Sequence, residues 1–533
     1  MSGAVGWWRA PHFWSNRGPT GRGTWYLLFL LLFVVIGAWS ASQPLFSYPD
    51  EGAQTVKAQA VAHGQLTYEY TPSDQPSIGK ATAPLAYKEG IVASLCFIFS
   101  PGRPASCAGP FQNSDRPVTL DTYVSRYPPL YYLLVAPASL VSSPSVGLYL
   151  MRLLSAAVSA AFLASALVSA LRLRSRPFLP LGVAVAMTPT AVYMASAVNP
   201  NGLEISSALC LWTAGLVYLC DGSAGDLRLL SRVGLSAAVL VSMRGLSPLW
   251  LALIGLALLA LCSRRRLRGV ARRTSVRVWA GVVVAVTVAA VAWIVAQHTL
   301  RIGGSGVPAQ WTLWHIVTDA ASFTLEYLRE MVNVFAPYPY PAPSSPAFVW
   351  GLVTVALLAL AMTSRGVARP ARRRTAAVIL ALIVAVLLIP IVIDTVSART
   401  EAFEWQGRYT LPLAVGIPVL AAYALGNDER LTRPPTLRLT AGVITFALVA
   451  EQIHQFVWTM HRYMVGINGP LDFLSGPWQP PAPPLLLTAA FVASVATLGV
   501  MLYLRTVSAG EAAASAASAA SGRPSPIGDL IHG

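Results

Sequence analysis

The chain has 533 residues, of which 55% are hydrophobic and only 11% are charged, and its mean hydropathy is +0.57. Soluble domains carry about 25% charged residues, so this composition excludes a soluble enzyme, a disordered chain and a disulfide scaffold. The net charge of +16 would indicate nucleic-acid binding in a soluble protein. Because apolar runs long enough to cross a bilayer recur along the chain, we interpret the charge first as a signal of membrane topology.

The apolar runs predict an all-α polytopic membrane protein with about 12 transmembrane helices, in a range of about 11 to 13. Ten runs are uninterrupted: residues 25–41, 146–171, 178–198, 203–219, 278–296, 348–362, 376–393, 409–425, 439–458 and 485–504. One further stretch, residues 233–262, is broken by Arg244, Gly245 and Pro248. It is either one kinked span or a hairpin of two.

Clusters of arginine decide between these alternatives, because short cytoplasmic loops retain Lys and Arg. The clusters lie at residues 172–176, 228–232, 264–277, 365–374 and 430–438. All of them fall on one side of the membrane only if residues 233–262 form a hairpin. Residues 1–24 are then a cytoplasmic N-terminal segment, residues 25–504 the transmembrane domain, and residues 505–533 a disordered cytoplasmic tail.

The same topology assigns the positive charge and the apolar run at residues 127–141. The whole of the excess positive charge falls in the cytoplasm, where anionic lipid headgroups are its natural partners and nucleic acid is not. The run 127–141 must be re-entrant or lie at the outer interface, and its prolines fit that position. The Arg- and Ala-rich composition is typical of a high-GC bacterial genome. We therefore expect a multi-pass protein of a bacterial plasma (inner) membrane, with both termini in the cytoplasm.

The first outer loop, residues 42–126, is where we expect the function, on the extracytoplasmic face. It is far longer than a connector needs and is expected to contain short helices. Cys96 and Cys107 both lie in this loop, in an oxidising space, and are predicted to form a disulfide. The sequence contains no spacing typical of a metal site and no nucleotide-binding motif, which excludes an ATP-driven pump.

Two adjacent carboxylates, Asp50 and Glu51, open this loop and are the candidate catalytic residues. Their neighbours can drive the two pKa values apart, so that one carboxylate accepts a proton or binds a cation. The alternative is that Asp50 caps a helix and Glu51 is a favourable first-turn charge. Lys57, on the helical run that follows, is a candidate substrate-binding cation.

Arginine and tyrosine also stand at the outer edge of two apolar runs. Arg126 and Tyr127 begin the run 127–141, where they either grip a lipid-linked phosphate or form an aromatic belt. The polar turn at residues 199–204 is also on the outer side and is expected to rim a cavity there.

Gln406, Arg408 and Tyr409 lead into the run 409–425 from outside. A guanidinium at this position can bind a phosphate bidentately. The alternative for Arg408 is an ion pair with a nearby acid, and the candidates are Asp394, Glu401 and Glu404.

Together these segments resemble an integral membrane family of bacteria, of actinobacterial type, that is catalogued as domain of unknown function 2142. The resemblance covers about residues 27–504 and is carried by Tyr48-Pro49-Asp50-Glu51, Tyr127-Pro128-Pro129-Leu130-Tyr131-Tyr132 and Gln406-Gly407-Arg408-Tyr409-Thr410-Leu411-Pro412. That family looks similar to the GT-C glycosyltransferases. The resemblance implies a GT-C-like fold, a polyprenyl-phosphate-linked sugar as donor and a cell-wall glycan or glycolipid as acceptor.

Carried onto this chain, the resemblance implies that Asp50 is the base or cation-binding carboxylate, that Glu51 supports it and that Arg408 holds the donor phosphate. Relatives often have His at the position of Gln54, so no metal is assigned, although a divalent cation stays compatible with Asp50. Two alternatives remain open: a flippase or transporter of lipid-linked sugars, and a non-catalytic subunit of an envelope-assembly complex. The outer clustering of charge favours the enzyme over the transporter.

Overall fold

The computed structural model describes residues 21–68, 78–220, 225–300, 306–334, 345–365, 368–400, 403–426, 428–472 and 474–520. Nearly all of the predicted N-terminal segment, and the last part of the predicted tail, lie outside these residues. Residue Glu401, one of the acids considered as a partner of Arg408, also lies outside them.

Among the described residues, eight helices are long and apolar enough to cross a membrane. They are α1 (Arg22–Ser42), α5 (Pro144–Ala170), α8 (Pro200–Cys220), α12 (Thr274–Ala296), α15 (Ser345–Thr363), α16 (Arg369–Ser397), α20 (Pro434–Val465) and α21 (Pro484–Ala520). A ninth is possible if α10 (Ser247–Leu261) and α11 (Arg264–Ala271), which meet at 118°, are one broken span. The chain is a multi-pass membrane protein of the predicted all-α class.

The predicted count of 12 spans is not confirmed, because four of the expected spans are shorter or broken helices. They are α6 (Leu179–Ala186) with α7 (Pro189–Ala195), α9 (Leu227–Val241), α10, and α17 (Leu411–Ala414) with α18 (Gly416–Leu425). The break before α7 follows from Pro189, which cannot donate to a preceding turn. Thr188 there caps α7 by accepting from the Ala191 N–H at 3.2 Å. Residues 233–262 form two helices, α9 and α10, as the hairpin prediction requires.

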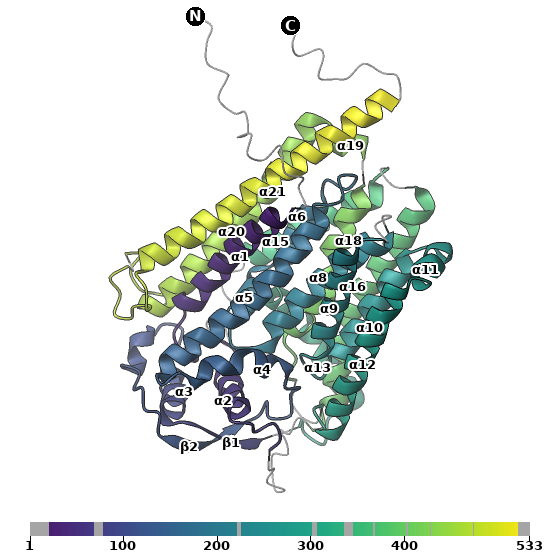
Figure 1. Cartoon of the computed structure of the whole chain (residues 1–533). Helices are drawn as coiled ribbons and strands as arrows, with labels where there is room; N and C mark the ends of the chain where they lie inside the picture. The colour runs from purple at the N-terminus through teal and green to yellow at the C-terminus, as the bar shows by residue number, and fades with distance from the viewer. Residues whose placement is uncertain are drawn as a thin grey trace, which may run out of the picture.

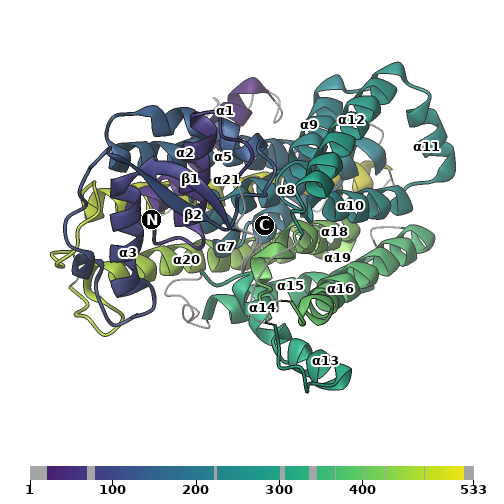
Figure 2. The ribbon, with the colours of Figure 1, turned by 90° about the horizontal axis from the view of Figure 1, so that it is seen from below.

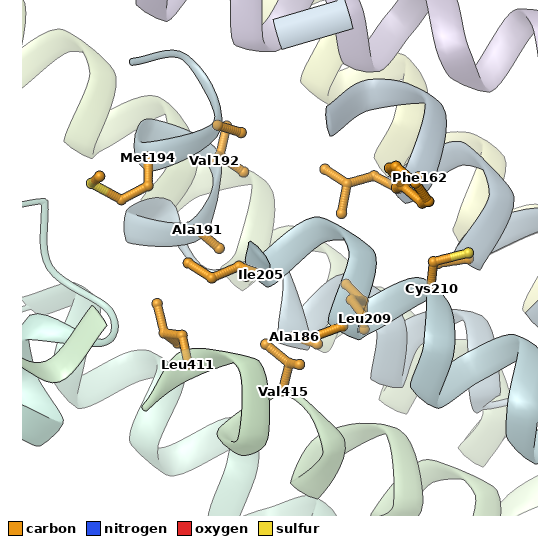
Figure 3. Close-up of a cluster of buried hydrophobic side chains, with 14 of the residues drawn as sticks. Phe162, Ala186, Ala191, Val192, Met194, Ile205, Leu209, Cys210, Leu411 and Val415 are labelled. Atoms are coloured by element: carbon orange, nitrogen blue, oxygen red, sulfur yellow. The ribbon is translucent and has the colours of Figure 1, made fainter. Parts of the chain in front are cut away.

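Helix α8 is the most enclosed span and packs on α5, α9 and α10 in the middle of the molecule (Figure 1). In its most apolar window 89% of the residues are buried, against 11% for α12, so α12 presents its Val side chains to lipid. Small residues allow close helix contact: a Cβ on Gly182 of α6 would lie 2.4 Å from the Ala422 Cβ of α18. Figure 3 shows the apolar centre, where side chains of α5, α7, α8 and α17 meet.

One end of the molecule, here called the loop end, carries most of residues 43–143 (Figure 1). Its elements are α2 (Glu51–Ala62), β1 (Gly79–Pro84), α3 (Leu85–Ile98), the 3₁₀ helix η2 (Ala105–Ala108), β2 (Pro117–Thr122), α4 (Leu130–Val135) and η3 (Ala136–Leu140). The short helices were predicted, whereas the antiparallel β1–β2 pair, from Gly79↔Thr122 to Pro84↔Pro117, was not. Cys96 and Cys107 form the predicted disulfide. The run 127–141 folds as α4 and η3 and does not cross as a straight span.

The remaining short elements come later in the chain. They are α13 (Leu313–Ser322), α14 (Thr324–Glu330), η4 (Gly407–Tyr409) and α19 (Glu429–Thr432). Seen from below, α13 and α14 lie on one side of the loop end, and the layer of α2, α3, β1 and β2 lies on the other (Figure 2). The basic helix α11, together with α19, lies toward the opposite end (Figure 1).

Helix α21 corrects the prediction for residues 505–533. It continues to Ala520, so residues 505–520 are helical where a disordered tail was expected. The physical reason is composition: this part is rich in Ala, the strongest helix former. Residues 521–533 lie outside the described part of the chain.

Candidate functional site

Asp50 lies at the turn where the chain leaves α1 and enters α2. Its backbone φ is 63°, in the left-handed region that Asp and Asn adopt more readily than other side chains. It occupies the N-cap position, but its carboxylate makes no capping hydrogen bond. Instead the Tyr123 hydroxyl donates to its Oδ1 at 2.9 Å, and the Arg408 guanidinium donates to its Oδ2. The carboxylate therefore points away from the helix it precedes.

Arg408, the partner of Asp50, lies on η4 and is only 4% exposed. The preceding Gly407 packs directly on α14, because a Cβ at this position would lie 2.0 Å from the Tyr327 carbonyl oxygen. The Gly407 N–H donates to Glu330 Oε2 at 2.6 Å. These contacts hold the Gly-Arg-Tyr segment in place and direct Arg408 toward Asp50.

A second guanidinium, that of Arg244, lies next to the same site. Its Cζ is 4.1 Å from the centroid of the Tyr409 ring, and that of Arg408 is 5.2 Å from the same centroid. Arg244 also donates to the Tyr127 hydroxyl at 3.3 Å and lies 3.9 Å from Glu204. Contacts between guanidinium groups and an aromatic ring are favourable, so Tyr409 keeps two positive groups close to Asp50.

A cavity of about 310 Å³ opens beside Asp50. Its walls include Asp50, Tyr123 and Gln406, together with residues of α3. Its volume is at the lower end of the usual range for ligand sites. Because the Asp50 side chain is 26% exposed, a ligand in this cavity could contact the carboxylate directly.

Glu51, next to Asp50 in the chain, has a different environment. Arg152 of α5 donates to both of its carboxylate oxygens, at 2.7 and 2.6 Å, and both side chains are fully buried. Arg152 also donates to the backbone carbonyls of Ser40, Gln43 and Pro44. The pair thus ties α5 to the end of α1 and the start of α2. This geometry favours a structural role for Glu51 over the predicted catalytic one.

Two of the predicted substrate-binding cations hold backbone segments. Lys57 is fully buried, and its Nζ donates to the carbonyls of Val124, Ser125 and Tyr127 at 2.6 to 3.0 Å. Burial lowers the pKa of Lys57 well below its usual value. Arg126, 8% exposed, donates to the His298 carbonyl at 3.3 Å. Neither residue lines the cavity beside Asp50.

The other polar positions singled out in the sequence are also accounted for. Gln54 is buried and accepts a hydrogen bond from the Tyr132 hydroxyl at 2.5 Å, so it does not line the cavity. Asn199 donates to the Pro49 carbonyl at 3.0 Å and so supports the turn at Asp50. Glu204 is buried and accepts from Ser247 at 2.6 Å, which places it behind Arg244 and away from the predicted rim.

The charge state of Asp50 follows from opposing effects. Burial by itself would raise its pKa, but the Arg408 guanidinium and the Tyr123 hydrogen bond favour the ionised form, and the net pKa is lowered. Asp50 is therefore ionised at neutral pH. Among the described residues, no group of three or more His, Cys, Asp or Glu side chains could hold a metal ion.

The profile of the family described as predicted membrane protein (DUF2142) matches residues 32–417, which is more than half of the chain. The chain belongs to this family. No match was found among curated proteins or among solved structures. The range common to the DUF2142 family contains Asp50, Arg152, Arg244 and Arg408, whereas α20 and α21 lie outside it.

Several site residues of this DUF2142 protein were not predicted from sequence. Arg152 carried a usable signal, since a charge inside an apolar run is costly and requires a partner. Arg244 was noted only as a break between spans. Tyr123 and Glu330 lie in polar connecting segments, where nothing in the sequence distinguishes them.

Proposed function

We propose that this DUF2142 protein is a glycosyltransferase. It moves a sugar from a polyprenyl-phosphate-linked donor to a cell-envelope glycan or glycolipid on the outer face of the membrane. One observation carries the proposal: the ion pair between Asp50 and Arg408, 358 residues apart, beside a cavity at the loop end. A carboxylate and a guanidinium are the two groups that this reaction requires.

The reaction has a balanced assignment of bonds and protons. The bond between the sugar anomeric carbon and the donor phosphate oxygen breaks, and a bond to the acceptor hydroxyl oxygen forms. Asp50 takes the hydroxyl proton as general base. Arg408 stabilises the negative charge that develops on the departing phosphate, and Arg244 lies close enough to contribute to the same field.

The ion pair itself has to open for this chemistry. Arg408 is nearly buried and keeps the pKa of Asp50 low, which makes Asp50 a weak base while the pair is closed. A donor phosphate that takes over the guanidinium would remove that stabilisation of the carboxylate and raise the pKa of Asp50. Donor binding and activation of the base are therefore coupled through one contact.

The other predicted site residues have supporting roles in this proposal. Gln406 lines the cavity, and Tyr409 holds the two guanidinium groups. Tyr127 orients Arg244 through its hydroxyl. Glu51, Lys57 and Arg126 hold the surrounding backbone. None of the three carries a proton in the proposed reaction.

The proposed orientation places the loop end outside a bacterial plasma membrane and both termini in the cytoplasm. The disulfide at the loop end and the basic helix α11 at the other end support it. An Arg268→Cys variant tests it: an impermeant thiol reagent should label position 268 only after the membrane is opened. Labelling of position 268 in intact cells would indicate the opposite orientation.

The enzymatic proposal is tested by mass spectrometry of envelope glycans from a deletion strain. Complementation with the unsubstituted chain should restore a missing sugar, whereas Asp50→Asn should not, although it inserts normally. Exposed Asp121 on β2 is the matched control, and Asp121→Asn should restore the sugar fully. Full restoration by Asp50→Asn would contradict the assignment of the base and would favour a transporter or a non-catalytic subunit.

A further inference from the structure

A second cavity, of about 480 Å³, adjoins the one beside Asp50. Phe46 and Ser94 line both cavities, so the two share a wall. The second cavity lies between α3, η2, the start of α5 and the segment around Trp478. None of the reacting groups assigned above lies in it.

The lining of this second cavity combines aromatic rings with neutral polar groups. The rings belong to Phe46, Phe97, Phe111, Tyr149 and Trp478, and the amides to Gln112 and Gln479. Glu89 is the one charged residue among those described that line it, and it is exposed to solvent. No Lys or Arg of the described residues lines it, so the cavity lacks a cation with which to bind a phosphate.

We propose that this second cavity binds the saccharide acceptor, and that the acceptor is a glycan chain of at least two sugar units. A sugar ring presents C–H groups on its faces, which pack on aromatic rings, and hydroxyls at its edge, which pair with amides. The amide nitrogens of Gln112 and Gln479 donate to the backbone carbonyls of Pro110 and Gly476, at 3.4 and 2.9 Å, so the amide oxygens are the groups that would accept from sugar hydroxyls. A polyprenyl tail has no hydroxyl to offer them. This inference rests on the proposed function, because it places the next unit of the chain beside Asp50.

The wall between the two cavities is held in a defined shape. Phe46 has a backbone φ of 62°, which is unusual for a large side chain, and its ring packs 6.3 Å from that of Phe111. Strained backbone of this kind is concentrated at functional sites. A Cβ on Gly90 would lie 2.6 Å from both rings, so glycine lets them approach α3. The disulfide links α3 to η2, which lines the second cavity only.

The shared wall determines how an acceptor would lie. Its reducing side would occupy the second cavity against Trp478, and its terminal sugar would pass Phe46 and Ser94 to reach Asp50. The enzyme would then extend an existing chain. A single free sugar would contact only one of the two cavities and bind weakly.

The experiment is a binding titration of the purified full chain in nanodiscs. The probe is a set of size-fractionated neutral oligosaccharides, released by mild acid from the envelope of the producing cells, and binding is followed by tryptophan fluorescence and calorimetry. We expect saturable binding of fractions with two or more units, and at least 10-fold weaker binding by Trp478→Ala. Trp314→Ala is the matched control, because Trp314 on α13 is 73% exposed and far from the cavity lining.

Gln479→Ala provides a milder second variant and should weaken binding without altering the melting temperature. If Trp478→Ala and Gln479→Ala both bind normally, or if no fraction binds saturably, the acceptor site is wrong even where sugar transfer is observed. Binding that depends on Trp478 in a chain without transfer activity would instead retain the saccharide site and overturn the proposed function.

Discussion

Asp50 and Glu51 are adjacent in the sequence, but the ion pairs that they form lie in different environments. Glu51 and Arg152 are fully buried, and the described contacts use both carboxylate oxygens. Asp50 is 26% exposed and shares its carboxylate between Arg408 and a tyrosine hydroxyl beside a cavity. The contrast shows that an acidic pair can combine one residue that fixes the fold with one that is available to a ligand.

The backbone at the start of α2 produces this separation. Asp50 is in the left-handed conformation, and Glu51 is the first residue of the helix. The change of conformation between them sends one side chain toward η4 and the other toward α5. Side-chain type alone therefore does not assign the two roles.

The largest expected difference in stability is between Glu51→Gln and Asp50→Asn, which make the same chemical change at the two positions. Glu51→Gln leaves Arg152 buried without its anion, and breaking a buried pair costs about 3 to 5 kcal/mol. Asp50→Asn also takes the anion from a nearly buried guanidinium, that of Arg408, but the Asp50 carboxylate is 26% exposed, so water can replace it and the cost should be smaller. Thermal unfolding of both variants in detergent measures the difference. Equal melting temperatures would show that the two pairs do not differ as described.

Glu330 adds a third carboxyl to the comparison, one whose described hydrogen bond comes from a backbone N–H. Burial raises its pKa to about 7 from 4.5. Because the folded state holds the Glu330 proton more tightly than the unfolded state, the contribution of Glu330 to the free energy of unfolding is greatest below about pH 4.5 and falls until the pH passes about 7. The total loss is about 3 kcal/mol. Glu330→Gln should flatten this part of the stability profile, which pH-dependent melting will measure; an unchanged slope would exclude Glu330 as its source.

Arg408→Ala should weaken binding of the donor, since a charged hydrogen bond contributes about 1.5 to 3 kcal/mol, or about 10- to 150-fold in affinity. The measurement is titration of a short-chain polyprenyl phosphate into the nanodisc-embedded chain. Arg116→Ala is the control, because Arg116 is exposed at the same end of the molecule. If both variants bind the polyprenyl phosphate with equal affinity, Arg408 does not bind the donor.

The smallest expected effect is that of Gly407→Ala. The added Cβ would overlap the Tyr327 carbonyl oxygen, and the strain of such overpacking costs about 1 to 3 kcal/mol. The displaced η4 should also lower sugar transfer. Gly255→Ala on α10 is the control, because no atom lies within 4 Å of its added Cβ. If both variants melt and react alike, Gly407 is not required to position Arg408.

The sequence predicted the class of fold because each span needs only its own apolar residues. It also placed Asp50 and Arg408 at one end of the molecule, since both follow or precede spans on the same side. Their contact could not be predicted, because it depends on how η4 packs on α14, far from Asp50 in the chain. The sequence predicted a substrate-binding role for Lys57 for a similar reason. Its three carbonyl partners belong to another segment of the loop, which the sequence does not show to be close to it.

The left-handed backbone of Asp50 also bears on how this chain can change through evolution. Asn and Gly adopt that conformation at little cost, and each is one nucleotide away from an aspartate codon. A single point mutation can therefore remove the negative charge while the protein still folds and inserts. If the proposed function holds, selection at position 50 would act mainly on the chemistry, whereas at position 51 misfolding would eliminate the mutant first. Inactive but well-folded descendants are thus readily reached from this sequence.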